Sequence, residues 1–187
     1  ISARSTSYRR ILLCLSIADV IQSLSIILGP FAVPQDTPDS IWAIGNTASC
    51  TTQGFLLNIA SVATPMYTFG LSIYFLLRVK YGMSREDFAA VVEWKWHTVT
   101  LLWNLVGNSY ILFTKSINAS RAGSLCHIDG LPLLCDVDPE KYGECIRGEN
   151  ALQIKSIVIY VPILVCFLSM GTSLGMLTWH VFAQESK

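Results

Sequence analysis

Four long apolar stretches constrain this chain more than any other feature of its sequence. They run over residues 11–33, 54–77, 97–114 and 154–182, and the third is the shortest. A hydrocarbon core of about 30 Å needs about 20 helical residues, and three of the four stretches exceed that length. Because lipid offers the backbone no hydrogen-bond partners, such stretches are expected to form helices. The sequence therefore predicts an all-α membrane protein with four transmembrane helices.

The composition agrees with a membrane protein and disfavours other classes. Only 14% of the residues are charged, whereas soluble domains carry roughly 25%. The formal net charge is zero, and no basic stripe is available to neutralise the phosphates of a nucleic acid. The chain starts at Ile1 with a polar segment that lacks the apolar part of a signal peptide. We therefore expect residues 1–187 to be a single transmembrane-bundle fragment of a longer protein.

The basic residues predict how the chain crosses the membrane. Those before the first stretch and after the second are Arg4, Arg9, Arg10, Arg78, Lys80, Arg85 and Lys95. The positive-inside rule places these segments, and so the N-terminus of the fragment, in the cytoplasm. Segments 34–53 and 115–153 are then extracellular loops, although the second also carries basic residues among its acids. This orientation suits an integral protein of the plasma membrane.

A glycosylation motif favours the same orientation. Asn118, Ala119 and Ser120 form an acceptor for an N-linked glycan, which is added only on the lumenal or extracellular side. A three-residue match occurs often by chance, so the motif is weak when taken alone. It predicts a glycoprotein with Asn118 as the modified residue.

The cysteines are a stronger sign of the outer side. Four of the six lie in the outer loops, namely Cys50, Cys126, Cys135 and Cys145. An even set on the oxidising side predicts two disulfides, and four cysteines allow three pairings. His127 beside Cys126 raises the alternative of a zinc site. The oxidising environment favours disulfides over this alternative, and we expect no metal or other cofactor.

Several polar residues lie within the apolar stretches. They are Asp19, Asn58, Asn104 and Asn108. An ionisable group within a membrane helix is costly, so Asp19 is expected to face the bundle interior. It either belongs to a functional polar network with the asparagines or is a neutral carboxyl with a packing role only. Asn104 and Asn108 are four residues apart, which places them on one helix face.

Signals of catalysis are weak. No glycine-rich phosphate loop and no His-Glu-x-x-His motif occurs, and no nucleophile is paired with a base in the sequence pattern. We therefore do not expect an enzyme. Arg78, Lys80 and Tyr81 follow the second stretch. The two basic residues are either topology anchors or contacts for a cytoplasmic partner.

Short motifs along the chain resemble one receptor family. "LSIADV" at 15–20 resembles the Leu-Ser-x-Ala-Asp element of receptor helix two, and "CTTQGF" at 50–55 is similar to the start of helix three. Trp42 and Gly45 resemble the Trp and Gly of the first extracellular loop, and Trp103 lies where helix four carries its Trp. The order of these motifs resembles helices two to five of a seven-transmembrane G-protein-coupled receptor, in its cAMP-receptor-like and secretin-like branch.

The resemblance implies a fold, a function and a disulfide pairing. The four helices would belong to a seven-helix receptor-type bundle that senses an extracellular ligand and signals to a heterotrimeric G protein. Arg78, Lys80 and Tyr81 would lie at the coupling end, and Cys50 would be bonded to Cys145, which leaves Cys126 with Cys135. The chain departs from the family in two places. It lacks the Asp-Arg-Tyr triplet of rhodopsin-like receptors, and Ile146 replaces the Trp expected after Cys145.

Two other kinds of membrane protein remain as alternatives. A transporter or channel fragment would bring polar groups together at the middle of the membrane, and Asp19, Asn58 and Asn104 fit that pattern loosely. A four-helix scaffold protein with a large outer loop has the same layout, although the Cys-Cys-Gly motif of tetraspanins is missing.

Overall fold

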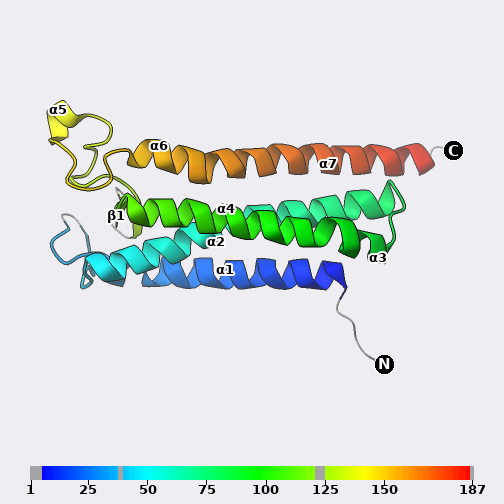
Figure 1. The fold of residues 1–187 in the computed structure, drawn as a ribbon, viewed down its shortest axis with the longest axis horizontal. Helices are drawn as coiled ribbons and strands as arrows, with labels where there is room; N and C mark the ends of the chain where they lie inside the picture. Colours follow the sequence, from blue (N-terminus) through cyan, green and yellow to red (C-terminus); the bar gives the residue numbers. More distant parts are fainter. Residues whose placement is uncertain (1–5, 38–39, 121–124, 186–187) are drawn as a thin grey trace, which may run out of the picture.

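The computed structural model describes residues 6–37, 40–120 and 125–185. Four long helices run side by side along the molecule (Figure 1). They are α1 (Ser7–Ala32), α2 (Thr47–Val79), α4 (Trp94–Phe113) and a continuous helix made of α6 (Ala151–Lys155), the π-helical turn η2 (Ser156–Tyr160) and α7 (Val161–Glu185). α2 is the central helix, because it packs against α1, α4 and α7.

The short elements lie at the two ends of this bundle. The strands β1 (Ile117–Ala119) and β2 (Cys126–Ile128) pair antiparallel, with Asn118 opposite His127, and helix α5 (Pro139–Tyr142) follows them. These elements lie at one end, which we call the disulfide end (Figure 1). Helix α3 (Arg85–Phe88), the π-helical turn η1 (Ala89–Glu93), the start of α1 and the end of α7 lie at the other, which we call the opposite end.

Three helices of the described residues are long and apolar enough to cross a membrane. They are Ser7–Ala32, Thr47–Val79 and Ala151–Glu185. The third predicted stretch also forms a helix, α4, but its 20 residues are not among these three. Each of the four helices begins before its apolar stretch, because the stretch marks only the residues suited to hydrocarbon. α2, for example, already starts at Thr47, where Asn46 caps it.

Large apolar side chains face outward from three of the helices. Ile27 of α1, Leu105 of α4 and Leu168 of α7 are each more than 60% exposed. Others on the same helices are Leu13, Ile17, Val20, Leu24, Leu101, Val106, Leu164 and Phe167. A soluble monomer rarely exposes apolar surface of this extent, whereas helices that face lipid do so throughout. The outward faces are therefore consistent with a membrane protein.

The contact between α2 and α4 depends on one glycine. A Cβ atom on Gly70 would lie 2.5 Å from the indole nitrogen of Trp96. Because Gly70 has no side chain, the Trp96 ring packs on α2 and its Nε1–H donates to the carbonyl of Met66 at 3.1 Å. Next to it, Tyr67 Oη lies 3.3 Å from His97 Nδ1. These contacts hold α4 against the central helix near the opposite end.

Candidate functional site

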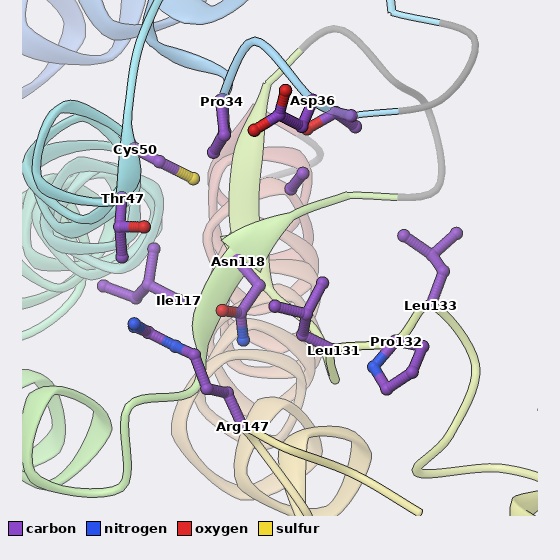
Figure 2. A pocket seen from close by; sticks show the side chains of 12 residues that line it. Pro34, Asp36, Thr47, Cys50, Ile117, Asn118, Leu131, Pro132, Leu133 and Arg147 are labelled. Atoms are coloured by element: carbon purple, nitrogen blue, oxygen red, sulfur yellow. The ribbon is translucent and has the colours of Figure 1, made fainter. Parts of the chain in front are cut away.

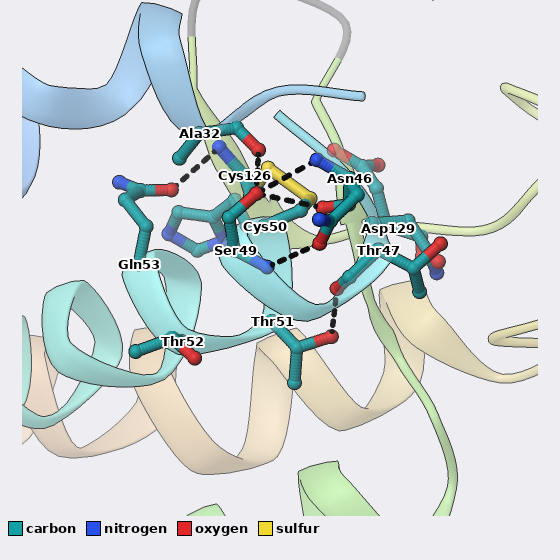
Figure 3. Close-up of a disulfide and its surroundings, with 12 residues drawn as sticks. Ala32, Asn46, Thr47, Ser49, Cys50, Thr51, Thr52, Gln53, Cys126 and Asp129 are labelled. Atoms are coloured by element: carbon teal, nitrogen blue, oxygen red, sulfur yellow. Dashed lines mark hydrogen bonds between the residues drawn. A yellow bond between two sulfur atoms is a disulfide. The ribbon is translucent and has the colours of Figure 1, made fainter. Parts of the chain in front are cut away.

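The start of α2 is attached to the end of α1. Asn46 caps α2 by accepting the backbone N–H groups of Ala48 and Ser49 at 2.9 and 3.0 Å. The Ser49 hydroxyl in turn accepts the N–H of Asn46 at 2.8 Å, which completes a capping box. The same hydroxyl donates to the carbonyl of Ala32 at 2.9 Å (Figure 3). One polar side chain thus links the two helix ends.

Gln53 joins three segments of the chain. Its Nε2 donates to the carbonyl of Ser25 in α1, and its Oε1 accepts the N–H of Cys126 in β2, each at 2.9 Å. The side chain is only 5% exposed. A buried polar group needs such partners, because an unpaired one would cost about 1–3 kcal/mol. The Gln53 amide, itself part of α2, therefore connects β2 to α1 and α2 through hydrogen bonds.

The disulfides differ from the pairing that the receptor resemblance implied. Cys50 is bonded to Cys126, and Cys135 is bonded to Cys145, with Cα–Cα distances of 5.4 and 5.2 Å. The predicted bonds from Cys50 to Cys145 and from Cys126 to Cys135 are therefore wrong. All four cysteines are nevertheless in disulfides, and Cys50 still ties α2 to the long loop.

Close packing of the hairpin on α2 explains the observed pairing. A Cβ atom on Gly54 would lie 2.4 Å from Ile117 Cγ2 and 3.1 Å from the carbonyl oxygen of Cys126. Because Gly54 leaves this space open, β1 and β2 lie directly on the first turns of α2 (Figure 3). Cys126 is thereby brought to Cys50, and the remaining two cysteines close a local loop.

A cavity of about 330 Å³ opens beside this disulfide. Its walls come from five segments: the chain after α1, the first turn of α2, the strand β1, and two later parts of the long loop. The lining residues are Pro34, Asp36, Thr37, Thr47, Cys50, Ile117, Asn118, Ala119, Leu131, Pro132, Leu133 and Arg147 (Figure 2). The lining is mainly apolar and holds one basic and one acidic side chain.

The two charged residues of the cavity lie on different walls. Asp36 is exposed, and Figure 2 shows it across the cavity from Arg147. The backbone of Arg147 is held by Leu131, whose N–H donates to the Arg147 carbonyl at 2.9 Å. The Arg147 Nε is buried and has no hydrogen-bond partner within the described part of the chain. Sequence patterns gave no sign of this residue, because a single Arg in a long polar loop is ordinary.

Asn118, the predicted glycosylation site, lines the same cavity but is buried. Its side chain is 5% exposed, and its Nδ2 donates to the carbonyls of Asp129 at 2.7 Å and Lys115 at 3.3 Å. A glycan would be attached to this same nitrogen, and it would break the contact with Asp129 and displace the loop packed on it. The expected modification of Asn118 is thus at odds with the folded loop.

Asp19 is not placed with the buried asparagines. Its carboxylate is exposed on α1, and its Oδ1 accepts a hydrogen bond from the Thr64 hydroxyl at 3.1 Å. Thr64 also lies 3.4 Å from Gln22 Oε1. The predicted network that joins Asp19 to the three asparagines is not formed in the described chain.

The three asparagines are buried between helices and only partly hydrogen-bonded. Asn58, Asn104 and Asn108 are 1, 9 and 2% exposed. Asn104 and Asn108 each donate to the carbonyl one turn earlier, of Thr100 and Asn104, at 2.9 Å. Both amide atoms of Asn58 and the Oδ1 atoms of the other two have no partner among the described residues. Buried amides in this state are available to a further polar group.

The residues predicted for coupling lie at the opposite end. Arg78 donates to the carbonyl of Met83 and so closes the turn between α2 and α3. The Lys80 ammonium lies 5.4 Å from the centre of the Tyr81 ring, and Tyr81 is 61% exposed. Arg78 therefore has a structural role in this turn, whereas Tyr81 is open to a partner.

An ion pair at the opposite end was not predicted. Arg10 Nε and Nη2 lie 2.5 and 2.6 Å from the two carboxylate oxygens of Glu93, and His97 Nε2 lies 3.7 Å from Glu93 Oε1. Glu93 is 5% exposed. The sequence signal was a single acid inside the apolar segment "AAVVEWKW". Such a residue is rarely buried without a partner.

The side chain of His127 has a shifted pKa. Burial and the nearby charge of Lys155 lower the pKa of His127 to about 4. Its Nδ1 accepts the N–H of Ile128 at 2.7 Å, so the neutral ring is held in place. Cys126, the neighbouring ligand in the zinc alternative, is bonded to Cys50.

No protein-family model matches the chain, and no curated protein matches it either.

Proposed function

We propose that this chain forms the helix-two to helix-five part of a G-protein-coupled receptor in the plasma membrane. In this proposal the disulfide end is extracellular and the opposite end is cytoplasmic, with all four long helices crossing the membrane. An extracellular ligand binds at the disulfide end and favours one of two helix packings. The exposed opposite end passes that change to a heterotrimeric G protein.

The cavity at the disulfide end is the observation that carries this proposal. It is lined by the chain that follows α1, by the first turn of α2, by β1 and by the long loop, so a ligand inside it would contact segments that lead to different helices. The bond from Cys50 to Cys126 and the Gln53 hydrogen bonds connect the cavity wall directly to α1 and α2. A ligand that changes the spacing of these walls would therefore move the helices themselves.

The test compares two matched pairs of a lysine with the next tyrosine. Lys80 and Tyr81 lie at the opposite end, and Lys141 and Tyr142 form the same cation–π contact at the disulfide end, at 5.1 Å. The full-length receptor would be expressed in cells and exposed to a panel of ligands. Dissociation of the G protein would be measured as a loss of resonance energy transfer between its labelled subunits. We expect Lys80→Gln with Tyr81→Ala to abolish the response at unchanged surface expression.

The control and the contrary outcome follow from the same design. Lys141→Gln with Tyr142→Ala removes an equivalent contact but should leave the coupling step intact. Equal loss in both double variants would show a general defect and not a coupling surface. If the wild-type protein engages no G protein with any ligand but conducts ions, the receptor proposal is wrong.

A part of a transporter or channel is a second candidate, favoured by the buried asparagines. Asn58 and Asn108 have amide atoms inside the bundle without a partner among the described residues, and such groups suit the coordination of a passing ion or polar solute. We expect Asn58→Leu to abolish transport of such a solute, measured as flux into vesicles. Absence of flux through the wild-type protein would exclude this candidate.

A further inference from the structure

We propose that the cavity at the disulfide end binds a small monoanion with an apolar body, such as an aromatic carboxylate, and that Arg147 holds its charge. The proposal names a ligand class for the receptor function proposed above and rests on that function for its biological meaning. The binding site itself is argued from the cavity alone.

Arg147 provides the first part of the argument. Its Nε has lost its water, since it is buried, and it donates to no group in the described chain. A buried donor atom of a charged group is costly when it has no partner. Arg147 lines the cavity (Figure 2), so a ligand there can supply that partner. A planar carboxylate matches the planar donor geometry of a guanidinium.

The start of α2 adds positive potential to the same cavity. Thr47 is the first residue of this 33-residue helix and lines the cavity together with Cys50. The N-terminus of a helix carries a partial positive charge and stabilises a nearby anion. No acidic side chain lies in the first turn of α2 to neutralise this charge. The N-terminus of α2 and Arg147 therefore both favour a negatively charged ligand.

The remaining walls of the cavity are apolar and determine the chemistry of the uncharged part of the ligand. Ile117, Leu131, Pro132 and Leu133 present apolar surface to the cavity, and apolar walls with few polar groups are typical of small-molecule sites. A volume of about 330 Å³ accepts a one- or two-ring molecule. These walls would bury its apolar body while the carboxylate reaches Arg147.

Asp36 limits the ligand to a single negative charge. It lies across the cavity from Arg147 and is exposed (Figure 2), so water screens its field but does not remove it. A ligand with a second negative charge at its other end would be repelled there. A monocarboxylate therefore fits the two walls better than a polyphosphate.

The experiment uses the protein in lipid nanodiscs and two probes of the same shape. 2-Naphthoate carries the charge and 2-naphthamide does not, and binding is measured by equilibrium dialysis against empty nanodiscs. We expect naphthoate to bind the wild type about tenfold more tightly than naphthamide, the difference that one charged hydrogen-bonded contact contributes. Arg147→Gln should remove this difference and leave naphthamide binding unchanged. Arg147→Lys should keep part of it.

Asp36→Asn is the matched control, because it removes a negative charge from the same cavity, whereas Arg147→Gln removes a positive one. It should not weaken naphthoate binding. Equal binding of the two probes, unchanged naphthoate binding in Arg147→Gln, or saturable binding of neither probe would overturn the proposal. Naphthoate binding without any G-protein response would keep the anion site and reject the receptor function. A G-protein response that is unchanged in Arg147→Gln would support the receptor function and reject the anion site as its ligand-binding site.

Discussion

At the scale of single residues, Gln53 is the clearest test of the disulfide end. Gln53→Leu keeps most of the side-chain volume but leaves the Ser25 carbonyl and the Cys126 N–H without their partner. Each buried group left unpaired costs about 1–3 kcal/mol. We expect the free energy of unfolding to fall by about 3 kcal/mol, measured by thermal or denaturant unfolding in detergent.

The neighbouring residue provides the control for this change. Thr52 is exposed, and its hydroxyl bonds only within its own helix. Thr52→Val should therefore alter stability by no more than about 0.5 kcal/mol. If Gln53→Leu were as mild as Thr52→Val, the amide would not hold β2 on the helices.

At the scale of elements, the contact between the hairpin and α2 depends on Gly54. Gly54→Ala would place a methyl group 2.4 Å from Ile117 Cγ2, closer than real contacts allow. We expect the hairpin to shift, with a loss of about 1–3 kcal/mol for an overpacked contact. Mass mapping of disulfide-linked peptides should find less of the bond between Cys50 and Cys126.

A second glycine separates this effect from helix propensity. Gly171 in α7 has nothing within 4 Å of a built Cβ. Gly171→Ala should therefore stabilise its helix slightly, by about 0.5–1 kcal/mol, and leave both disulfides intact. A normal yield of the bond between Cys50 and Cys126 in Gly54→Ala would contradict the proposed packing.

The hairpin should also respond to acid through His127. Its pKa is lowered from 6.5 to about 4 in the folded chain, so between these values the unfolded chain binds the proton and the folded chain does not. Stability is then lost as the pH falls from about 6.5 toward 4. We expect hydrogen exchange of β1 and β2 to accelerate over this range, and His127→Gln to remove much of that acceleration. An unchanged profile in His127→Gln would assign the effect to other groups.

At the scale of the whole molecule, the ion pair between Arg10 and Glu93 joins the two helices on either side of α2. The Glu93 side chain is 6% exposed but that of Arg10 is 42% exposed, so the two variants are not equivalent. Arg10→Met leaves a buried carboxylate and should cost about 3 kcal/mol. Glu93→Gln leaves an Arg that can reach water and should cost about 1 kcal/mol.

Unfolding of both variants in the same detergent would measure this asymmetry. Arg9→Met is a fitting control, because it removes a charge from the neighbouring position, which is exposed. If Glu93→Gln lowered the free energy of unfolding more than Arg10→Met, the burial of Glu93 would not explain the size of the loss.

The sequence by itself determined the helices and the chemistry of the outer cysteines. All four apolar stretches form helices, because length and hydropathy are properties of each segment alone. The even set of four cysteines likewise predicted that all of them are in disulfides. Buried Asn104 and Asn108 lie on one face of α4, as their spacing of four residues requires.

Only the tertiary structure decided which of these segments meet. The pairing of Cys50 with Cys126 depends on the space left at Gly54, and the burial of Asn118 depends on the carbonyl of Asp129. The cavity with Arg147 exists because five separate segments of the chain converge beside that disulfide. No local pattern reports such contacts, since they arise from shape and hydrogen bonding between segments and not from the preferences of any one of them.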